Sequence, residues 1–444
     1  ARPLRAAPPC GQGPPPRGAA MGQQLEKPVT AKESACGAAD GGLGIAWASS
    51  CMQGWRIGME DAHITQPFLR VDGAQGGIVS AALTAGWRGI GLFGVFDGHG
   101  GEHVAKFVER HLAEELCSFP VGFSPQGRNE RDVSAALRET FHRMDELLFD
   151  KKSLPELCSL ANRPVQGDSM ERLARESRVD PDNIGCTACV CCVTERHFIV
   201  ANAGDSRAVL CRDGKAVPLS FDHKPNHPEE RRRIEASGGT VEPSGPGQFR
   251  VNGNLNLSRA LGDLTYKRQR GLRPEQQTIC ATPDVMVEER TARDEFVVIC
   301  CDGVWDMMEN QEVVDFVLER VPTLRSRAQG GGAASAGVGP TPQRLEQIME
   351  QLLDACLSPD LRKTGGYGGD NMTAVIFRLT EALPHHATVD TDAGGESGVI
   401  RVQASSCENS CGNVERWRQF VCKHIRTCRD FCIQRRHTRS HTVH

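Results

Sequence analysis

Short apolar runs recur between residues 43 and 380, separated by longer amphipathic stretches. The short runs are rich in aliphatic and β-branched residues, and Gly, Asp or Asn stands at their ends, which is typical of buried strands. On this pattern we expect strands at residues 44–49, 90–96, 188–193, 197–201, 208–211, 296–301 and 372–379.

Helical periodicity appears in five other segments, where apolar residues return every three or four positions. One of them has Pro228 at a first-turn position and Gly238-Gly239 just past its end, which are common start and stop signals. The predicted helices are residues 102–116, 133–149, 228–236, 311–321 and 344–357. Several strands follow one another between residues 186 and 220 with only turns between them. This order favours antiparallel sheets with helices outside them, an α+β fold, over a doubly wound parallel sheet.

These patterned segments predict one structured body at residues 43–380 in a chain of 444 residues. Residues 1–42 are expected to be a disordered segment, because Ala, Arg, Pro and Gly dominate its first 20 positions. Polar or Gly-rich stretches predict three insertions in the body, followed by a linker and a basic, Cys-rich tail. The insertions are residues 72–89, residues 151–183, which are expected to be irregular, and residues 325–341. The linker is residues 381–413 and the tail is residues 414–444.

Composition excludes several classes of protein. The net charge is −4 and the pI about 6.4, so the chain lacks the basic field of a nucleic-acid-binding protein. A mean hydropathy of −0.38, without a long apolar run, argues against a membrane span. No secretory signal is recognisable at the start, and the 19 cysteines are an odd number. Free thiols in the cytoplasm or nucleus therefore fit better than disulfides.

Acidic residues stand at the ends of predicted strands, where a solvated face would not place them. Asp97 directly follows an apolar strand and precedes Gly98, and Asp302 follows another. Similar positions are held by Asp205, Asp370, Glu60 and Asp61. A single Asp-Gly pair is more often an ordinary turn. Five such positions at strand ends, with the adjacent Glu60 and Asp61 counted as one, favour a site for hard divalent cations, which take carboxylate, carbonyl and water ligands.

Two basic residues beside these carboxylates suggest chemistry at phosphorus. Arg56 lies four positions before Glu60, and a guanidinium binds phosphate through paired hydrogen bonds. His99 lies two positions after Asp97 and titrates in the range useful for acid–base catalysis. In a two-metal site, activated water attacks phosphorus in line with the leaving oxygen. Taken singly, Arg56 could be a surface residue and His99 a structural histidine in a turn.

Seven short motifs occur in an order that resembles the metal-dependent Ser/Thr protein phosphatases of type 2C (PPM family). They span residues 54–376, nearly the whole predicted body. The motifs begin at Gly54-Trp55-Arg56, Val95-Phe96-Asp97-Gly98-His99-Gly100-Gly101, Asn202-Ala203-Gly204-Asp205, Asp222-His223-Lys224-Pro225, Leu257-Ser258-Arg259-Ala260-Leu261-Gly262-Asp263, Cys301-Asp302-Gly303 and Asp370-Asn371-Met372-Thr373.

The resemblance implies a β-sandwich of two antiparallel sheets flanked by α-helices, with two Mg²⁺ or Mn²⁺ ions at one end. It implies an enzyme that hydrolyses phosphoserine and phosphothreonine in proteins, working as a monomer, and a flap at residues 223–258 beside the site. Cys186 stands where the family commonly has Ser or Thr, a small and tolerable change. A scaffold that binds phosphoproteins without hydrolysing them is the alternative, but its mark would be missing carboxylates, and none is missing.

The resemblance also implies roles for the site residues. Asp97 would bridge both ions and the Gly98 carbonyl would bind one of them. Arg56 would hold the phosphate and His99 would be the general acid. The remaining ligands would be Asp302 and Asp370 at the other ion, Glu60 and Asp61 through waters, and Asp205 at a third, weaker metal site.

The two ends of the chain carry signals of membrane or partner binding. Met21-Gly22 resembles the start of family members that are myristoylated, although Glu26 stands where the motif wants Ser or Thr. In residues 414–444, apolar residues and cysteines form one helical stripe among eight Lys and Arg. Such a helix is typical of a peripheral membrane segment, with palmitoylation of its cysteines, or of a calmodulin-type target. Docking on the body and a solvated tail stay open. We expect a cytoplasmic protein, with the membrane surface and the nucleus as alternatives.

Overall fold

The structure is a computed structural model, and it describes residues 24–39, 43–69, 86–87, 89–124, 127–161, 181–245, 247–321 and 339–379. Most of the predicted insertions, the linker, the basic tail and Gly22 lie outside these residues. All described residues belong to one compact unit, which comprises residues 1–384. Among them, no helix is long and apolar enough to cross a membrane.

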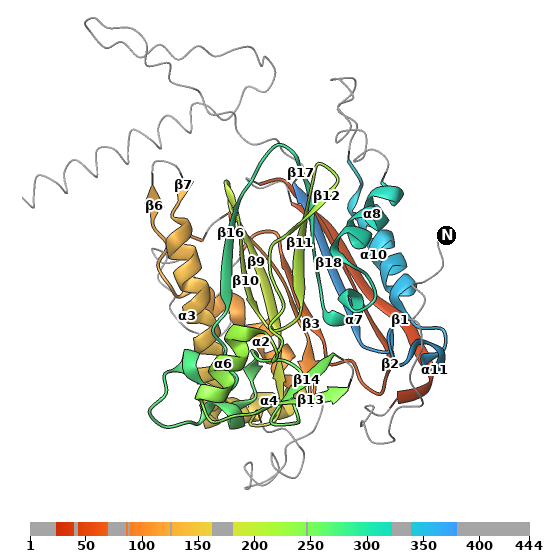
Figure 1. Ribbon diagram of the computed structural model, residues 1–444. Coiled ribbons are helices and arrows are strands. Elements are labelled where there is room, and N and C mark those ends of the chain that lie inside the picture. The colour runs from red at the N-terminus through yellow and green to blue at the C-terminus, as the bar shows by residue number, and fades with distance from the viewer. Residues whose placement is uncertain are drawn as a thin grey trace, which may run out of the picture. The chain divides into compact units, whose positions relative to one another are not determined.

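Two antiparallel sheets form the centre of this unit (Figure 1). The first sheet has six strands in the order β1-β2-β18-β17-β11-β12. Their bounds are β1 Gln24–Ala39, β2 Ile45–Arg56, β18 Met372–Leu379, β17 Asp294–Cys300, β11 Arg207–Arg212 and β12 Lys215–Pro218. The second sheet has five strands in the order β16-β10-β9-β4-β3. Their bounds are β16 Asp284–Glu289, β10 His197–Ala203, β9 Ala188–Val193, β4 Gly91–Phe96 and β3 Ala62–Gln66.

Both faces of the central strands are buried, which explains their continuous apolar runs. Along β9, Cys189 and Cys191 point into the core between the sheets, whereas Val190 and Cys192 face the outer helices. Between the sheets, the rings of Phe93 and Phe377 stack with their centroids 4.3 Å apart. The described cysteines are all free, and most are buried, as expected for thiols used as small apolar groups.

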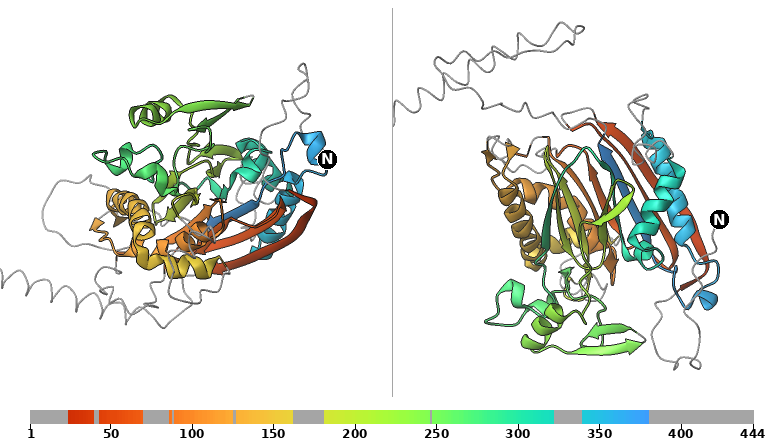
Figure 2. Two further views of the ribbon diagram at one scale, coloured as in Figure 1. Left: turned by 90° about the horizontal axis from the view of Figure 1, so that it is seen from below. Right: turned by 45° about the horizontal axis from the view of Figure 1, so that its top comes forward.

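Helices cover the outer face of each sheet (Figure 1 and Figure 2). The second sheet is covered by α2 His103–Cys117, α3 Glu130–Phe149 and α4 Leu154–Leu160, and the first by α7 Asp302–Trp305, α8 Asn310–Arg320 and α10 Pro342–Cys356. Side-chain caps begin two of them: Asn129 accepts a hydrogen bond from the Arg131 amide, and Thr341 from the Arg344 amide.

A smaller group of elements forms the flap. It contains α6 Pro228–Ala236 and the hairpin β13 Val241–Gly245 with β14 Gln248–Val251, packed on an apolar cluster of its own around Ile234 and Ile279. A three-stranded sheet joins the neighbouring segments, in the order β15 Leu261–Gly262, β8 Gly185–Cys186 and β5 Gly98–His99. The remaining short elements are β6 Phe123–Ser124, β7 Gly127–Arg128, η1 Lys151–Ser153, η2 Leu264–Lys267, η3 Pro274–Gln276 and α11 Leu361–Thr364.

The α+β sandwich predicted above is confirmed, and each predicted strand and helix has a counterpart. Two expectations are wrong. Residues 24–39 are not disordered but form β1, because the ladder to β2 satisfies their backbone while Lys32 and Ser34 bind Asp354 and Glu350 of α10. Residues 151–160 are not irregular but form η1 and α4, because Leu157 and Cys158 pack into the core under α2.

Candidate active site

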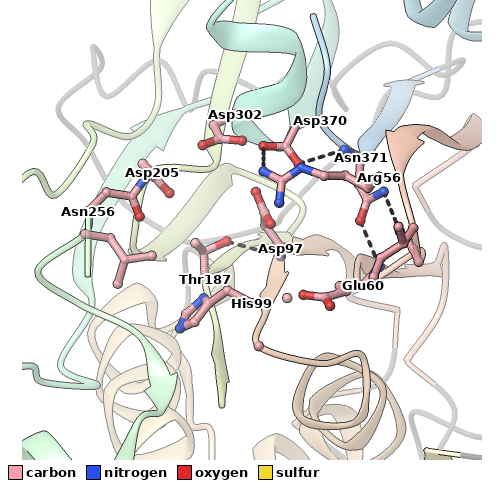
Figure 3. Close-up of a pocket in the computed structure, with 15 residues that line it drawn as sticks. Arg56, Glu60, Asp97, His99, Thr187, Asp205, Asn256, Asp302, Asp370 and Asn371 are labelled. Carbon is pink, nitrogen blue, oxygen red and sulfur yellow. Dashed lines mark hydrogen bonds and ion pairs between the residues drawn. The ribbon is translucent and has the colours of Figure 1, made fainter. Parts of the chain in front are cut away.

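A cleft of about 280 Å³ opens where strands of both sheets end (Figure 3). Its lining is dominated by oxygen atoms, together with one guanidinium and one imidazole. The lining residues are Arg56, Ile57, Gly58, Glu60, Asp97, Gly98, His99, Gly100, Thr187, Asp205, Asn256, Leu257, Asp302, Asp370 and Asn371.

Strand register brings the predicted residues to this one edge. In the first sheet, Cys300 lies opposite Ala374 and Met372 lies opposite Met52. The end of β17 (before Asp302), the start of β18 (after Asp370) and the end of β2 (at Arg56) therefore meet. In the second sheet, Ala203 lies opposite Ala188, so that Asp205, beyond β10, emerges near Thr187. The Thr187 hydroxyl accepts a hydrogen bond from the Asp97 amide, at 3.2 Å, just past the end of β4.

Arg56 and Asp370 form an ion pair on one wall of the cleft. The Arg56 Nη2 atom lies 2.5 Å from Asp370 Oδ2. The Asn371 side chain fixes the surrounding turn. Its Nδ2 atom donates to the backbone carbonyls of Gln53 and Gly58, and its Oδ1 atom accepts from the backbone N–H of Glu60. The guanidinium is thus held in the cleft while more than a third of its side chain stays exposed.

The carboxylates in the cleft carry more negative charge than the described side chains neutralise. Removal from bulk water, followed by repulsion from Asp61 and Asp302, raises the pKa of Asp97 well above its usual range. Burial, followed by repulsion from Asp205 and Asp370, does the same for the pKa of Asp302. Burial also raises the pKa of Glu60. A cation in the cleft would offset the repulsion between these carboxylates and the cost of burying their charges.

Asp61 lies behind the cleft and does not line it. Its Oδ2 atom accepts a 2.7 Å hydrogen bond from the Thr373 hydroxyl, whereas its buried Oδ1 atom has no hydrogen-bond partner among the described residues. One ligand atom each from Asp61, Asp97 and Cys301 lies within 4.8 Å of the others. Burial raises the pKa of Asp61 to about 6. An orphaned buried oxygen at this place fits a water or ion that completes its bonding.

The residues present therefore fit a hard divalent cation. The donors are carboxylate and carbonyl oxygens, which suit Mg²⁺ or Mn²⁺. Gly98 is part of this fit, because a Cβ atom there would lie 2.2 Å from the Glu60 carbonyl oxygen. The Cys301 sulfur is engaged elsewhere, since it accepts a hydrogen bond from the Thr373 amide at 3.1 Å.

His99 is held by Asp263, whose role no pattern in the sequence predicted. Its Nε2 atom lies 2.6 Å from Asp263 Oδ2, and Asp263 is 2% exposed. Burial lowers the pKa of His99, but the charge and hydrogen bond of Asp263 outweigh this and raise it. Gly185 makes the approach feasible, because a Cβ there would lie 2.3 Å from Asp263 Oδ2.

Asp205 is also paired with a residue that sequence reasoning missed. It is 2% exposed and bonded to the Lys224 ammonium. Attraction to Asp205 and Asp302 outweighs the burial of Lys224 and raises the pKa of its ammonium. Both Asp263 and Lys224 belong to motifs that were recognised in the sequence, but nothing in the spacing says what they contact.

A protein-family model described as Protein phosphatase 2C matches residues 45–363. The chain belongs to the protein phosphatase 2C family. It is accordingly a protein serine/threonine phosphatase, a hydrolase. The family assignment confirms the resemblance seen in the sequence.

Curated relatives match this phosphatase over nearly their full length. "Protein phosphatase 2C 1" of Paramecium tetraurelia is 40% identical over 359 residues, which are 81% of this chain and 99% of that protein. "Probable protein phosphatase 2C 11" of Oryza sativa subsp. japonica is 33% identical over 412 residues, or 88% of this chain and 99% of that protein. Among solved structures, a serine-threonine phosphatase 2C from Toxoplasma gondii aligns with a TM-score of 0.51 at 19% identity, covering 80% of this chain and 98% of that one. The structural likeness supports the fold alone.

The phosphatase places nearly all predicted site residues in the cleft. Arg56, His99 and the backbone of Gly98 line it, as do five of the predicted carboxylates, which are Asp97, Asp302, Asp370, Glu60 and Asp205. Asp61 does not line the cleft, but one of its ligand atoms lies within 4.8 Å of one of Asp97. The structure adds Thr187, Asn371, Asp263 and Lys224 as their direct hydrogen-bond or ion-pair partners.

Proposed function

We propose that this phosphatase hydrolyses phosphoserine and phosphothreonine in proteins with two Mg²⁺ or Mn²⁺ ions held in the cleft. The observation that carries the proposal is the convergence of five carboxylates and Arg56 on one cleft. Ions bound there would neutralise these carboxylates and supply a water nucleophile at neutral pH.

The ligand roles follow the family resemblance and the positions of the side chains. Asp97 would bridge the two ions from the floor of the cleft, with the Gly98 carbonyl on one of them and Glu60 beside it through water. Asp302 and Asp370 would hold the other ion. Asp61 would support the site through waters from behind. Asp205 would serve a third, weaker ion in competition with the Lys224 ammonium.

Arg56 and His99 would act on the substrate itself. The Arg56 guanidinium lies at the cleft wall and can bind the phosphate oxygens through paired hydrogen bonds. His99, with Asp263 on its Nε2 atom, would protonate the leaving serine or threonine oxygen.

The lining residues favour attack by water over attack by a serine, threonine or cysteine side chain. Among the fifteen, Thr187 alone carries a hydroxyl and none carries a thiol. Thr187 is 1% exposed, and its oxygen is already bonded to the Asp97 amide and the Ser206 hydroxyl. It is therefore a poor candidate for a nucleophile.

The test replaces Asp302 by Asn, which removes a charge and keeps the volume. We expect Asp302→Asn to lower Mn²⁺-dependent hydrolysis of a phosphothreonine peptide by about a hundredfold or more. Circular dichroism and urea unfolding check that the fold persists. Unchanged activity in a folded variant would refute the assignment. An assay with and without Mg²⁺ separates this enzyme from a scaffold that binds phosphoproteins without hydrolysing them.

A further inference from the structure

One large apolar side chain is exposed on the wall of the catalytic cleft. Ile57 lines the cleft with 63% of its surface exposed. The other large apolar lining residue, Leu257, is 3% exposed and packs into the apolar cluster of the flap. The other lining residues are charged, polar or glycine. Among the described residues of the lining, Ile57 is therefore the one exposed apolar group that a bound peptide could cover.

The backbone on either side of Ile57 is held in place by hydrogen bonds, although the Ile57 side chain is exposed. The side-chain amide of Asn371 donates to the backbone carbonyls of Gln53, at 2.8 Å, and Gly58, at 2.9 Å. The side-chain amide of Gln53 donates to the backbone carbonyl of Arg56 at 2.8 Å. These hydrogen bonds stabilise the turn that contains Ile57 from both sides. Exposing an isoleucine on such a turn brings no packing energy to the free protein.

The position of Ile57 relative to the phosphate site sets what it can touch. Arg56 is its chain neighbour, at a Cα spacing of about 3.8 Å. An extended peptide advances about 3.3–3.6 Å for each residue. Because Arg56 and Ile57 line the same cleft, a residue one or two positions from the phosphorylated one can come within reach of Ile57 when Arg56 holds the phosphate.

The opposite side of the cleft offers a different kind of contact. Asn256, on the flap, lies across the cleft from Arg56 and Glu60 (Figure 3). Its exposed amide can both donate to and accept from the backbone of an extended peptide. A contact with the backbone would hold every peptide alike, whereas Ile57 would distinguish peptides by their side chains.

We propose that Ile57 is a specificity-determining residue that selects phosphoprotein segments with an apolar side chain next to the phosphorylated residue. This inference rests on the proposed function and names a substrate class for the same cleft. An apolar neighbour would remove the exposed surface of Ile57 from water, whereas a charged neighbour placed there would lose hydration without a partner.

The experiment compares the full-length protein with Ile57→Lys and Ile57→Ala. The substrates are phosphothreonine peptides in an alanine background, with Leu, Asp or Lys placed singly at each of the two positions on either side. Val287→Lys is the matched control, because Val287 is 40% exposed on β16 and does not line the cleft. Hydrolysis of p-nitrophenyl phosphate, which has no flanking residues, reports on the chemistry alone.

The native protein and Val287→Lys should prefer Leu to Asp by about five- to tenfold in kcat/KM at one flanking position. Ile57→Ala should lose that preference and Ile57→Lys should reverse it towards Asp. The preference is a ratio between peptides within one variant, so it does not depend on that variant's rate with p-nitrophenyl phosphate, which Val287→Lys should hydrolyse as the native protein does. The same preference in the native protein and in Ile57→Lys, or no preference in the native protein, would overturn the inference and leave the proposed function intact. Loss of p-nitrophenyl phosphate hydrolysis in the native protein would overturn both.

Discussion

The Nε2 atom of His99 lies 2.6 Å from the Oδ2 atom of Asp263, a carboxylate that is 2% exposed. Asp263 adopts a left-handed backbone conformation with φ of 49°, which is uncommon for a residue other than glycine. Its amide donates to the Ile184 carbonyl at 2.9 Å, which ties it to the segment before β8. The imidazole is therefore oriented through its Nε2 atom by a buried carboxylate.

Loss of this contact should affect substrates that need a proton more than those that do not. We expect Asp263→Asn to lower kcat for a phosphoserine peptide by about tenfold, because the serine oxygen must be protonated as it leaves. With p-nitrophenyl phosphate, whose leaving group departs without a proton, the loss should be smaller. His99→Gln should show the same contrast with a larger amplitude. Equal losses on both substrates would contradict the orienting role.

The stability of the metal-free protein should rise as the pH falls from 7.5 to 5. Burial raises the pKa of Asp61 to about 6, above the value in an unfolded chain, so the folded state takes up its proton first. The raised pKa values of Asp97, Asp302 and His99 act in the same direction. For each proton that the folded state binds and the unfolded state does not, the free energy of unfolding rises by about 1.4 kcal/mol for each unit by which the pH falls.

Urea unfolding in EDTA at pH 7.5, 6 and 5 measures this effect. Asp61→Asn should flatten the curve, and saturating Mg²⁺ should stabilise the protein most at pH 7.5, where the carboxylates are charged. A metal-free protein that loses stability steadily over the same pH range would contradict the prediction.

Two glycines that line the cleft, Gly58 and Gly98, should respond differently to replacement by alanine. A Cβ at Gly98 would lie 2.2 Å from the Glu60 carbonyl oxygen, whereas one at Gly58 would meet nothing within 4 Å. Gly98→Ala should therefore displace the backbone of Glu60 and weaken Mn²⁺ binding by about tenfold or more, as measured by calorimetric titration. Gly58→Ala should bind as the native protein does, and a comparable loss there would show that the contact with Glu60 is not the cause.

A buried ion pair between α3 and η2 should be costly to break on one side only. The Lys267 Nζ atom lies 2.6 Å from Asp145 Oδ2, with side-chain exposures of 4% and 12%. Lys267→Met should lower the free energy of unfolding by about 3 kcal/mol, because Asp145 stays buried without its cation. Lys267→Met combined with Asp145→Asn should recover most of that loss. The side-chain oxygen at position 145 can still accept a hydrogen bond from the backbone N–H of Gly262. Urea unfolding of the two variants provides the comparison.

The sequence predicted the elements that are defined by their own residues, such as an apolar run or start and stop signals. The strand at residues 188–193 and the helix at residues 228–236 have the predicted bounds, because an apolar run and a Pro-to-Gly frame define them locally. The strand β1 was missed because its side chains are small or polar, and the partners that order it, β2 and α10, come later in the chain.

The same distinction holds in the cleft. Asp97 and Asp302 were found because they follow apolar strands directly. The roles of Asp263 and Lys224 could not be predicted, because each depends on a contact between different elements of the fold. Asp263 contacts His99, which is 164 positions away, and Lys224 contacts Asp205, which is 19 positions away. Pairing across a fold leaves no periodic trace in one sequence.

The position of β1 at the edge of the six-stranded sheet has a practical consequence for anyone who shortens the chain. The family model begins at residue 45, and a version cut there would lack all 16 residues of β1. The Ile45–Arg56 strand would then present its hydrogen-bonding groups to solvent, and an unprotected strand of this kind invites pairing with another molecule. Such a preparation would be expected to self-associate during purification, and retaining residues 24–39 is the remedy.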